Sequence, residues 1–230
     1  MTKILSIETA ATVCSVAVHE QGKLLGLSEL CVENIHGEKL IPIINELLLG
    51  LGLRGGEMDA IAVSKGPGSY TGLRIGVSSA KGLAYAWDLP LIGVDTLDAL
   101  ARQCLTYTGS EDVVIAALDA RRMEVYAKVV DSRGAVLQDT SPIVVDSDTF
   151  RAFLDEGRMV YLIGNATAKL KEVLVHPNLL FVQRDNSAKT VGEIAFDRYR
   201  LGRFENLAYF EPNYLKEFMV LQSRKQLLNS

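Results

Sequence analysis

The chain has 230 residues, of which 48% are hydrophobic and 23% are charged, and its formal net charge is -4. These values are ordinary for a globular protein and leave room for one large hydrophobic core or two small ones. A protein that binds nucleic acid by itself usually carries a basic patch, because phosphate neutralisation supplies most of the affinity. The sequence has no dense run of lysine and arginine, which argues against independent RNA binding.

The cysteines and the apolar stretches of the sequence indicate the cell compartment in which the protein is expected. Cys14, Cys31 and Cys104 include no C-x-x-C pair, which argues against a disulfide framework and a structural zinc site. The opening apolar stretch is interrupted by Glu8, and the most apolar segment, 40–53, is too short to span a bilayer. We therefore expect a cytoplasmic protein that does not enter a membrane.

Short apolar runs predict a three-stranded meander at the start of the chain, followed by strands that alternate with helices. β-Branched residues favour extended structure, and Gly22-Lys23 predicts a tight turn. The expected strands of this half are 3–7, 13–18, 24–30, 60–64 and 91–94, and the expected helices lie near 38–51, 71–87 and 96–105.

The same order recurs in the second half of the chain. Strands at 113–118, 125–129 and around Val136 are separated by turns at 119–122 and 132–134. Helices are then expected near 148–154, 166–173 and 191–201, and strands near 160–163 and 180–182. This repeat predicts an α/β protein with two lobes, each a mixed sheet flanked by helices.

A polar stretch at 106–112 predicts the boundary between the two lobes. The chain then divides into an N-terminal lobe over 1–106, a C-terminal lobe over 107–213 and a closing helix over 214–230. The expected neighbour of that closing helix is the N-terminal lobe.

The densest local motif is Gly66-Pro67-Gly68-Ser69-Tyr70-Thr71-Gly72-Leu73-Arg74-Ile75-Gly76, between a strand and a helix. Glycines permit close approach of the backbone, and Ser69 or Thr71 can cap the helix. A helix start after a glycine loop can bind an anion, but Leu73 follows Gly72 where a Walker loop has lysine. The motif favours a structural turn and leaves phosphate binding as the alternative.

This motif resembles the hallmark of the bacterial TsaB (YeaZ) family. Three further stretches resemble that family in the same order: ILSIETAATVCSVAV at the start, LDARRMEVYA over 118–127, and EPNYLK over 211–216. The resemblance covers essentially the whole chain. It implies a duplicated actin-like, Hsp70-like, sugar-kinase fold with RNase H-like lobes, and a role in making threonylcarbamoyladenosine in tRNA, next to the anticodon.

The same resemblance implies the partners of this chain. It describes a non-catalytic scaffold and activator that forms a heterodimer with a catalytic TsaD-like paralogue, joined by a TsaE-like ATPase. tRNA is then bound only through the complex. ATP and metal are expected on the partner subunits, and no cofactor is expected on this chain alone. An apolar interface should seldom be left bare, so we expect homodimers when the paralogue is absent.

Two turns argue against catalysis by this chain. In sugar kinases, the turn after the first strand carries an acid followed by glycine. Here the turns 8–12 and 119–122 contain no glycine, and a Cβ restricts positive φ. Glu8 and Asp119 are therefore expected to be hydrogen-bonded turn carboxylates.

No metal site is predicted either. The catalytic paralogue carries two histidines four residues apart on a helix, which hold a metal. In this sequence the position four residues after His36 is Leu40, which cannot be a ligand. His36 is instead expected to precede a helix that begins at about Glu38, where an acid is favourable.

The first two helices carry more apolar surface than one core needs. The first helix has an apolar stripe at helical spacing, and three further apolar residues lie largely outside it: Ile41, Ile43 and Leu49. In the second, interior glycines permit close contact between helices. The partner interface is predicted at Ile41, Ile44, Leu48, Leu49, Gly72, Leu73, Gly76, Ser79, Ala80 and Leu83.

Two enzymatic alternatives remain open at this point. A kinase-like phosphotransferase of the same fold would bind nucleotide saturably with magnesium, and a metalloprotease-like hydrolase would hold a stoichiometric metal. The residues that would form a residual nucleotide or anion site are Glu8, Ser69, Thr71, Arg74 and Asp119.

Overall fold

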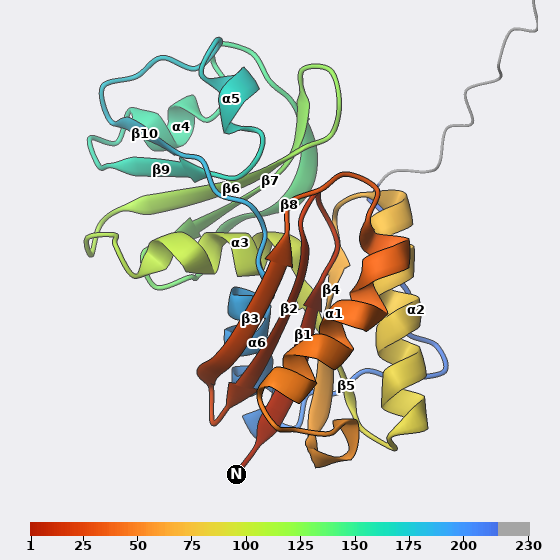
Figure 1. Ribbon diagram of the computed structural model, residues 1–230. Coiled ribbons are helices and arrows are strands. Elements are labelled where there is room, and N and C mark those ends of the chain that lie inside the picture. The colour runs from red at the N-terminus through yellow and green to blue at the C-terminus, as the bar shows by residue number, and fades with distance from the viewer. Residues whose placement is uncertain (216–230) are drawn as a thin grey trace, which may run out of the picture.

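The computed structural model describes residues 1–215 as two lobes, each built on a five-stranded mixed sheet (Figure 1). The first sheet contains β1 (Lys3–Glu8), β2 (Cys14–Glu20), β3 (Lys23–Leu30), β4 (Ala60–Gly66) and β5 (Leu91–Asp95), in the order β3-β2-β1-β4-β5. β1, β2 and β3 form an antiparallel meander, whereas β1, β4 and β5 are parallel.

The second sheet repeats this topology. It contains β6 (Val113–Asp119), β7 (Glu124–Asp131), β8 (Val136–Val144), β9 (Val160–Ile163) and β10 (Leu179–Val182), in the order β10-β9-β6-β7-β8. Its meander is again antiparallel, and β6, β9 and β10 are parallel. The predicted duplication is therefore confirmed, and the lobes have the actin-like, RNase H-like fold.

Helices cover both faces of each sheet (Figure 1). α1 (His36–Gly50) and α2 (Tyr70–Ala86) pack on one face of the first sheet. α3 (Thr96–Leu105) and α6 (Ala188–Arg200) lie nearer the middle of the molecule. The short helices α4 (Arg151–Leu154) and α5 (Thr167–Leu170) cover the outer face of the second sheet.

The two middle helices pack across the lobe boundary. α3 follows the last strand of the first sheet, yet its Leu97 and Leu100 pack on β6 and β9. α6 falls within the range 107–213 that the sequence assigns to the second lobe, yet it packs on the first sheet through Val191 and Ala195. An apolar face in the sequence of a helix predicts that the helix packs on a sheet, but it does not predict which of the two sheets.

Several element bounds differ from the predicted ones. α1 begins at His36 instead of Glu38, because the Ile35 carbonyl already accepts a hydrogen bond from the Lys39 amide at 3.0 Å. The His36 ring is buried and lies 3.2 Å from the Val13 carbonyl. α6 begins earlier than predicted because the Ser187 side chain accepts a hydrogen bond from the Lys189 amide and caps the helix. β8 is longer than predicted, and α4 and α5 are single short turns.

Cys14 and Cys104 are buried, and burial raises the pKa of each thiol to about 11. Cys31 is exposed. Within residues 1–215, no helix combines the length and apolar character needed to cross a bilayer. The predicted closing helix falls mostly on residues 216–230, which lie outside the described part of the chain.

Candidate functional site

The turn between β1 and β2 is closed around a buried carboxylate. Glu8 is 0% exposed, and its Oε1 accepts a 2.6 Å hydrogen bond from the Ala10 amide. Its Oε2 accepts a short hydrogen bond from the Ser64 hydroxyl at the end of β4. Burial raises the pKa of Glu8 to about 7, although these hydrogen bonds act in the opposite direction. Glu8 is therefore a hydrogen-bonded turn carboxylate, as predicted, and solvent does not reach it.

The glycine-rich loop packs against this same turn. A Cβ on Gly68 would lie 2.3 Å from the Ala10 carbonyl oxygen, and one on Gly72 would lie 2.1 Å from the Thr9 carbonyl oxygen. A Cβ on Gly76 would lie 2.1 Å from Thr9 Oγ1. Only glycine permits so close an approach. The loop is thus filled by the chain's own turn, at the place where a phosphate-binding loop would hold its ligand.

These contacts correct one part of the interface prediction. Gly72 and Gly76 face the β1–β2 turn and are buried, so their small size serves packing inside the lobe. Leu73 and Ala80, from the same face of α2, belong to the core, as do Ile44 and Leu48 of α1. Ile43, predicted to lie off the apolar stripe, is buried as well. The sequence missed this because helical spacing alone does not separate a face that meets the sheet from one that meets a partner.

The outer face of α1 and α2 carries the remaining apolar residues. Ile41 is 50% exposed and Leu49 is 68% exposed, and Asn45 lies between them at the spacing of one helical turn. On α2, Tyr85 is 81% exposed and Gly82 has open space around it. Ser79 and Leu83, also predicted, are half-buried, and Leu83 packs against the core of the first lobe. We call Ile41, Leu49, Gly82 and Tyr85 the outer helix face.

The first turn of α2 brings together three of the five residues named for an anion site. The Ser69 hydroxyl caps the helix by accepting from the Gly72 amide at 3.3 Å, and Thr71 is exposed. The Arg74 guanidinium lies 4.3 Å from the centroid of the Tyr70 ring and donates to the Tyr214 hydroxyl. Arg74 therefore anchors the C-terminal segment on α2.

The equivalent turn of the second lobe is organised by a lysine. Asp119 Oδ1 accepts from the Arg121 amide at 2.7 Å and from Lys169 Nζ at 2.8 Å. Lys169 also donates to the carbonyls of Arg122 and Glu124, at 2.8 and 2.7 Å. Asp119 is thus a turn carboxylate, as predicted, and it stands in a different lobe from the other residues named for the anion site. The sequence around Lys169 does not predict this contact, because Lys169 is far from Asp119 along the chain.

This second turn adopts a conformation that the sequence argued against. Arg121 has a φ of +72° and Arg122 has a φ of +48°. The left-handed region costs a residue with a Cβ about 1–2 kcal/mol. Lys169 donates to the Asp119 carboxylate and to two backbone carbonyls of the turn, and these three hydrogen bonds offset that cost.

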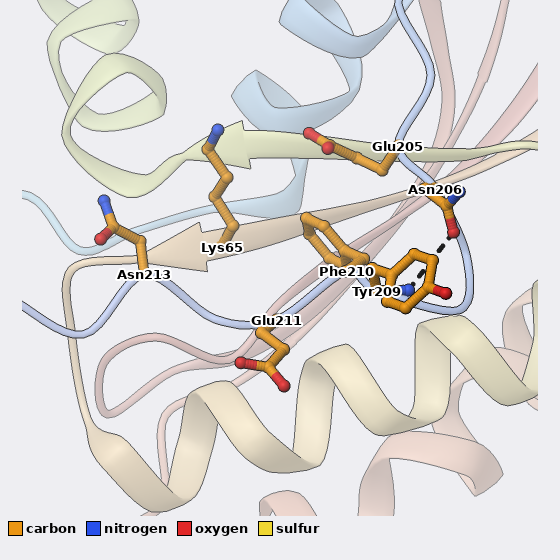
Figure 2. A pocket seen from close by; sticks show the side chains of 7 residues that line it. All are labelled: Lys65, Glu205, Asn206, Tyr209, Phe210, Glu211 and Asn213. Atoms are coloured by element: carbon orange, nitrogen blue, oxygen red, sulfur yellow. Dashed lines mark hydrogen bonds between the residues drawn. The ribbon is translucent and has the colours of Figure 1, made fainter.

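A shallow hollow of about 420 Å³ lies between the end of β4 and the C-terminal segment (Figure 2). Its lining residues are Lys65, Glu205, Asn206, Tyr209, Phe210, Glu211 and Asn213. Lys65 pairs with Asp95 at 3.7 Å, and Glu211 points away from Lys65 and Glu205. The polar groups do not converge on one point, so the hollow is not a candidate catalytic site.

Histidines and acids do not gather into a metal site in the part of the chain that the structure describes. His36 is bonded to the Val13 carbonyl, and the next position on its helix face, Leu40, is in the core. His19 is buried under α6, and neither of its ring nitrogens has a hydrogen-bond partner among residues 1–215.

Comparison with known proteins places these features in a family. A family model described as TsaD, tRNA N6-adenosine threonylcarbamoyltransferase, matches residues 29–188. Proteins named tRNA threonylcarbamoyladenosine biosynthesis protein TsaB from Haemophilus influenzae and Escherichia coli are each 40% identical to this chain, over 123 and 124 residues. Those stretches cover 54% of this chain and 51% and 53% of the two relatives, so the match spans about half of their length.

Solved structures extend the likeness over nearly the whole chain. A Pseudomonas aeruginosa protein described as similar to peptidase YEAZ covers 94% of this chain and 100% of its own, with a TM-score of 0.83 and 26% identity. A structure of YeaZ from the same organism has the same coverage, a TM-score of 0.79 and 27% identity. This chain therefore belongs to the family described by the TsaD model and, within it, to the TsaB (YeaZ) group.

Proposed function

We propose that this chain acts in the biosynthesis of threonylcarbamoyladenosine in tRNA, as a non-catalytic subunit that binds and activates a TsaD-like paralogue. The names of its TsaB relatives support the pathway. The single observation that carries the non-catalytic role is the closed β1–β2 turn, in which Glu8 is buried and Thr9 and Ala10 occupy the space along the glycine loop.

The chemistry of that turn explains the role. A catalytic site of this fold needs an acid that reaches a metal–nucleotide complex and a loop that leaves room for phosphates. Glu8 accepts hydrogen bonds from Ser64 and the Ala10 amide. Asp119 accepts hydrogen bonds from Lys169 and the Arg121 amide. Glu8 cannot reach a metal without breaking its turn, and Asp119 Oδ1 is already bonded to Lys169 and the Arg121 amide. ATP and metal then belong to the partner subunits, one of them a TsaE-like ATPase.

The outer helix face is the proposed contact with the paralogue. Exposed apolar groups on two adjacent helices favour a helix-to-helix contact, and Gly82 lets another helix approach closely. A paralogue of the same fold carries an equivalent pair of helices, so the two pairs would form a four-helix contact. tRNA is bound by the assembled complex in the cytoplasm, and this chain pairs with itself when the paralogue is absent.

The test is light-scattering chromatography of this chain mixed with its TsaD-like paralogue, with threonylcarbamoyl transfer to tRNA assayed across the same fractions. The expected result is a defined heteromer whose activity needs both proteins. Leu49→Glu and Ile41→Glu should abolish the heteromer, because each buries a charge in an apolar contact. Val175→Glu is the matched control, since Val175 is 87% exposed in the second lobe.

Two separate peaks, with transfer activity unaffected by this chain, would overturn the proposal. Loss of the heteromer in the Val175→Glu control as well would place the contact elsewhere than on the outer helix face.

A further inference from the structure

The turn 119–124 between β6 and β7 presents two arginines that the proposed function leaves without a role. Arg121 and Arg122 are exposed, and neither guanidinium has an acidic partner within residues 1–215. The turn lies where β6 and β7 end, beside α5 (Figure 1). Two adjacent cations are thus held at an exposed turn of a chain whose net charge is -4.

The backbone of this turn is fixed rather than loose. Both arginines adopt the left-handed conformation, which residues with a Cβ seldom enter. Lys169 of α5 uses its ammonium on three oxygens of the turn, those of Asp119, Arg122 and Glu124. It therefore neutralises Asp119, which lies two residues before Arg121, and keeps it in the turn. Strained backbone that is held by its surroundings clusters at functional positions.

We propose that this turn binds the phosphate backbone of RNA, with Arg121 and Arg122 contacting phosphates and Lys169 as the residue that positions them. The proposal rests on the proposed function, since it takes tRNA as the polyanion that the complex handles. Arginine suits phosphate because its planar guanidinium donates two parallel hydrogen bonds. Adjacent arginines match a ligand whose charges repeat along a chain, which an RNA backbone provides.

The location of the charge agrees with this assignment. The chain carries a net charge of -4, so attraction of a polyanion is expected at exposed cations that have no acidic partner. Lys169 is 18% exposed at its side chain and is satisfied inside the turn, so it acts through the arginines instead of touching the ligand. Contact by two arginines is weak alone, and it orients RNA that the partner subunits also hold.

The experiment measures binding of a fluorescein-labelled tRNA transcript by fluorescence anisotropy at several salt concentrations. It is run on this chain mixed with its paralogue and on this chain alone at low salt. The variants are Arg121→Gln with Arg122→Gln, and Lys169→Met. The matched control is Arg133→Gln, because Arg133 is exposed in the other hairpin turn of the same lobe and its side chain has no acidic partner among the described residues.

The double variant is expected to bind the tRNA about tenfold more weakly or worse near 0.1 M salt. The slope of log affinity against log salt should fall by about 0.7–0.9 for each lost phosphate contact. Lys169→Met should weaken binding although both guanidinium groups remain, and Lys169→Arg should restore part of it. Arg133→Gln should bind as the unaltered protein does.

Equal affinity and slope in the double variant and the unaltered protein would overturn this proposal, as would the absence of tRNA binding by the unaltered protein in both formats. If the double variant keeps its tRNA binding and loses the paralogue, the turn is a protein contact and the proposal is wrong. These results are separate from the fate of the proposed function, which fails if no heteromer forms. In that case, binding by the chain alone still decides the role of the turn.

Discussion

Thr9 and Gly76 are in direct contact: a Cβ on Gly76 would lie 2.1 Å from Thr9 Oγ1, and that hydroxyl donates a 2.8 Å hydrogen bond to the Gly72 carbonyl. The contact joins the β1–β2 turn to α2 and leaves no room between them. α2 is held on its inner side in this way, while its outer side at Gly82 remains open.

This asymmetry predicts opposite effects for two identical substitutions on one helix. Gly76→Ala should lower the free energy of unfolding by about 1–3 kcal/mol, because the added methyl overlaps Thr9. Gly82→Ala should raise it by about 1 kcal/mol, because alanine favours the helix and meets no neighbour. Urea unfolding followed by circular dichroism measures both. Shifts of equal size and sign would contradict the packing described for α2.

Glu8 should make stability depend on pH between about 4.5 and 7. Its pKa is raised from 4.5 to about 7 by burial, so the folded state binds this proton more tightly than the unfolded state. The resulting stabilisation is full below pH 4.5 and is lost as the pH rises through 7, by about 3 kcal/mol in total. Glu8→Gln cannot ionise and can still accept the Ala10 hydrogen bond, so it should be more stable than the unaltered protein at pH 8.

The measurement is urea unfolding from pH 5 to pH 8.5, with Glu46→Gln on the exposed face of α1 as the control for loss of one negative charge. The advantage of Glu8→Gln should grow with pH, whereas the control should show no such growth. Parallel curves for Glu8→Gln and the unaltered protein would contradict the buried, raised pKa.

His19 should make the protein less stable as the pH falls, which is the opposite of the effect of Glu8, over nearly the same pH range. Burial lowers the pKa of His19 from 6.5 to about 4, so the unfolded state takes up the proton first. Stability is therefore lost as the pH falls from about 6.5 to 4, by up to about 3 kcal/mol. His19→Leu should remove this acid sensitivity, and the double variant with Glu8→Gln should have the flattest profile of the set. Acid unfolding curves that are unchanged in His19→Leu would rule this out.

Nucleotide should not stabilise the isolated chain. A ligand at one hundred times its dissociation constant stabilises its protein by about 2.7 kcal/mol, which a thermal shift detects easily. We expect magnesium and ATP to leave the melting temperature unchanged, because Glu8 is buried and Asp119 is hydrogen-bonded to Lys169. The paralogue, measured in parallel, is the positive control. A saturable, magnesium-dependent shift in this chain alone would revive the kinase-like alternative.

Self-association should depend on the outer helix face. Without the paralogue, we expect the apolar groups of Ile41, Leu49 and Tyr85 to pair two copies of the chain. Leu49→Glu should return the protein to a monomer in sedimentation at high concentration, while Val175→Glu should not. An unaltered protein that stays monomeric at all concentrations would refute this prediction.

Much of the fold followed from local sequence pattern. The apolar runs with their turn residues located the strands of both sheets, and the recurrence of one order of elements indicated two similar lobes. Glu8 and Asp119 were predicted as turn carboxylates because polar residues between strands bond to their own backbone. The family followed from four separated motifs, of which the loop 66–76 is the most specific.

The structure decided which surfaces those elements use. Helical spacing marked Gly72, Gly76 and Leu73 as one face, but contact with Thr9 in the folded chain assigned that face to the interior. For the same reason, the sequence did not predict that α3 packs on the second sheet and α6 on the first. It also did not predict that Lys169 is hydrogen-bonded to the turn 119–124. The sequence by itself determined the elements, their order and the family, because those depend on local pattern. Only the tertiary structure decided what each face meets, because such contacts join residues far apart along the chain.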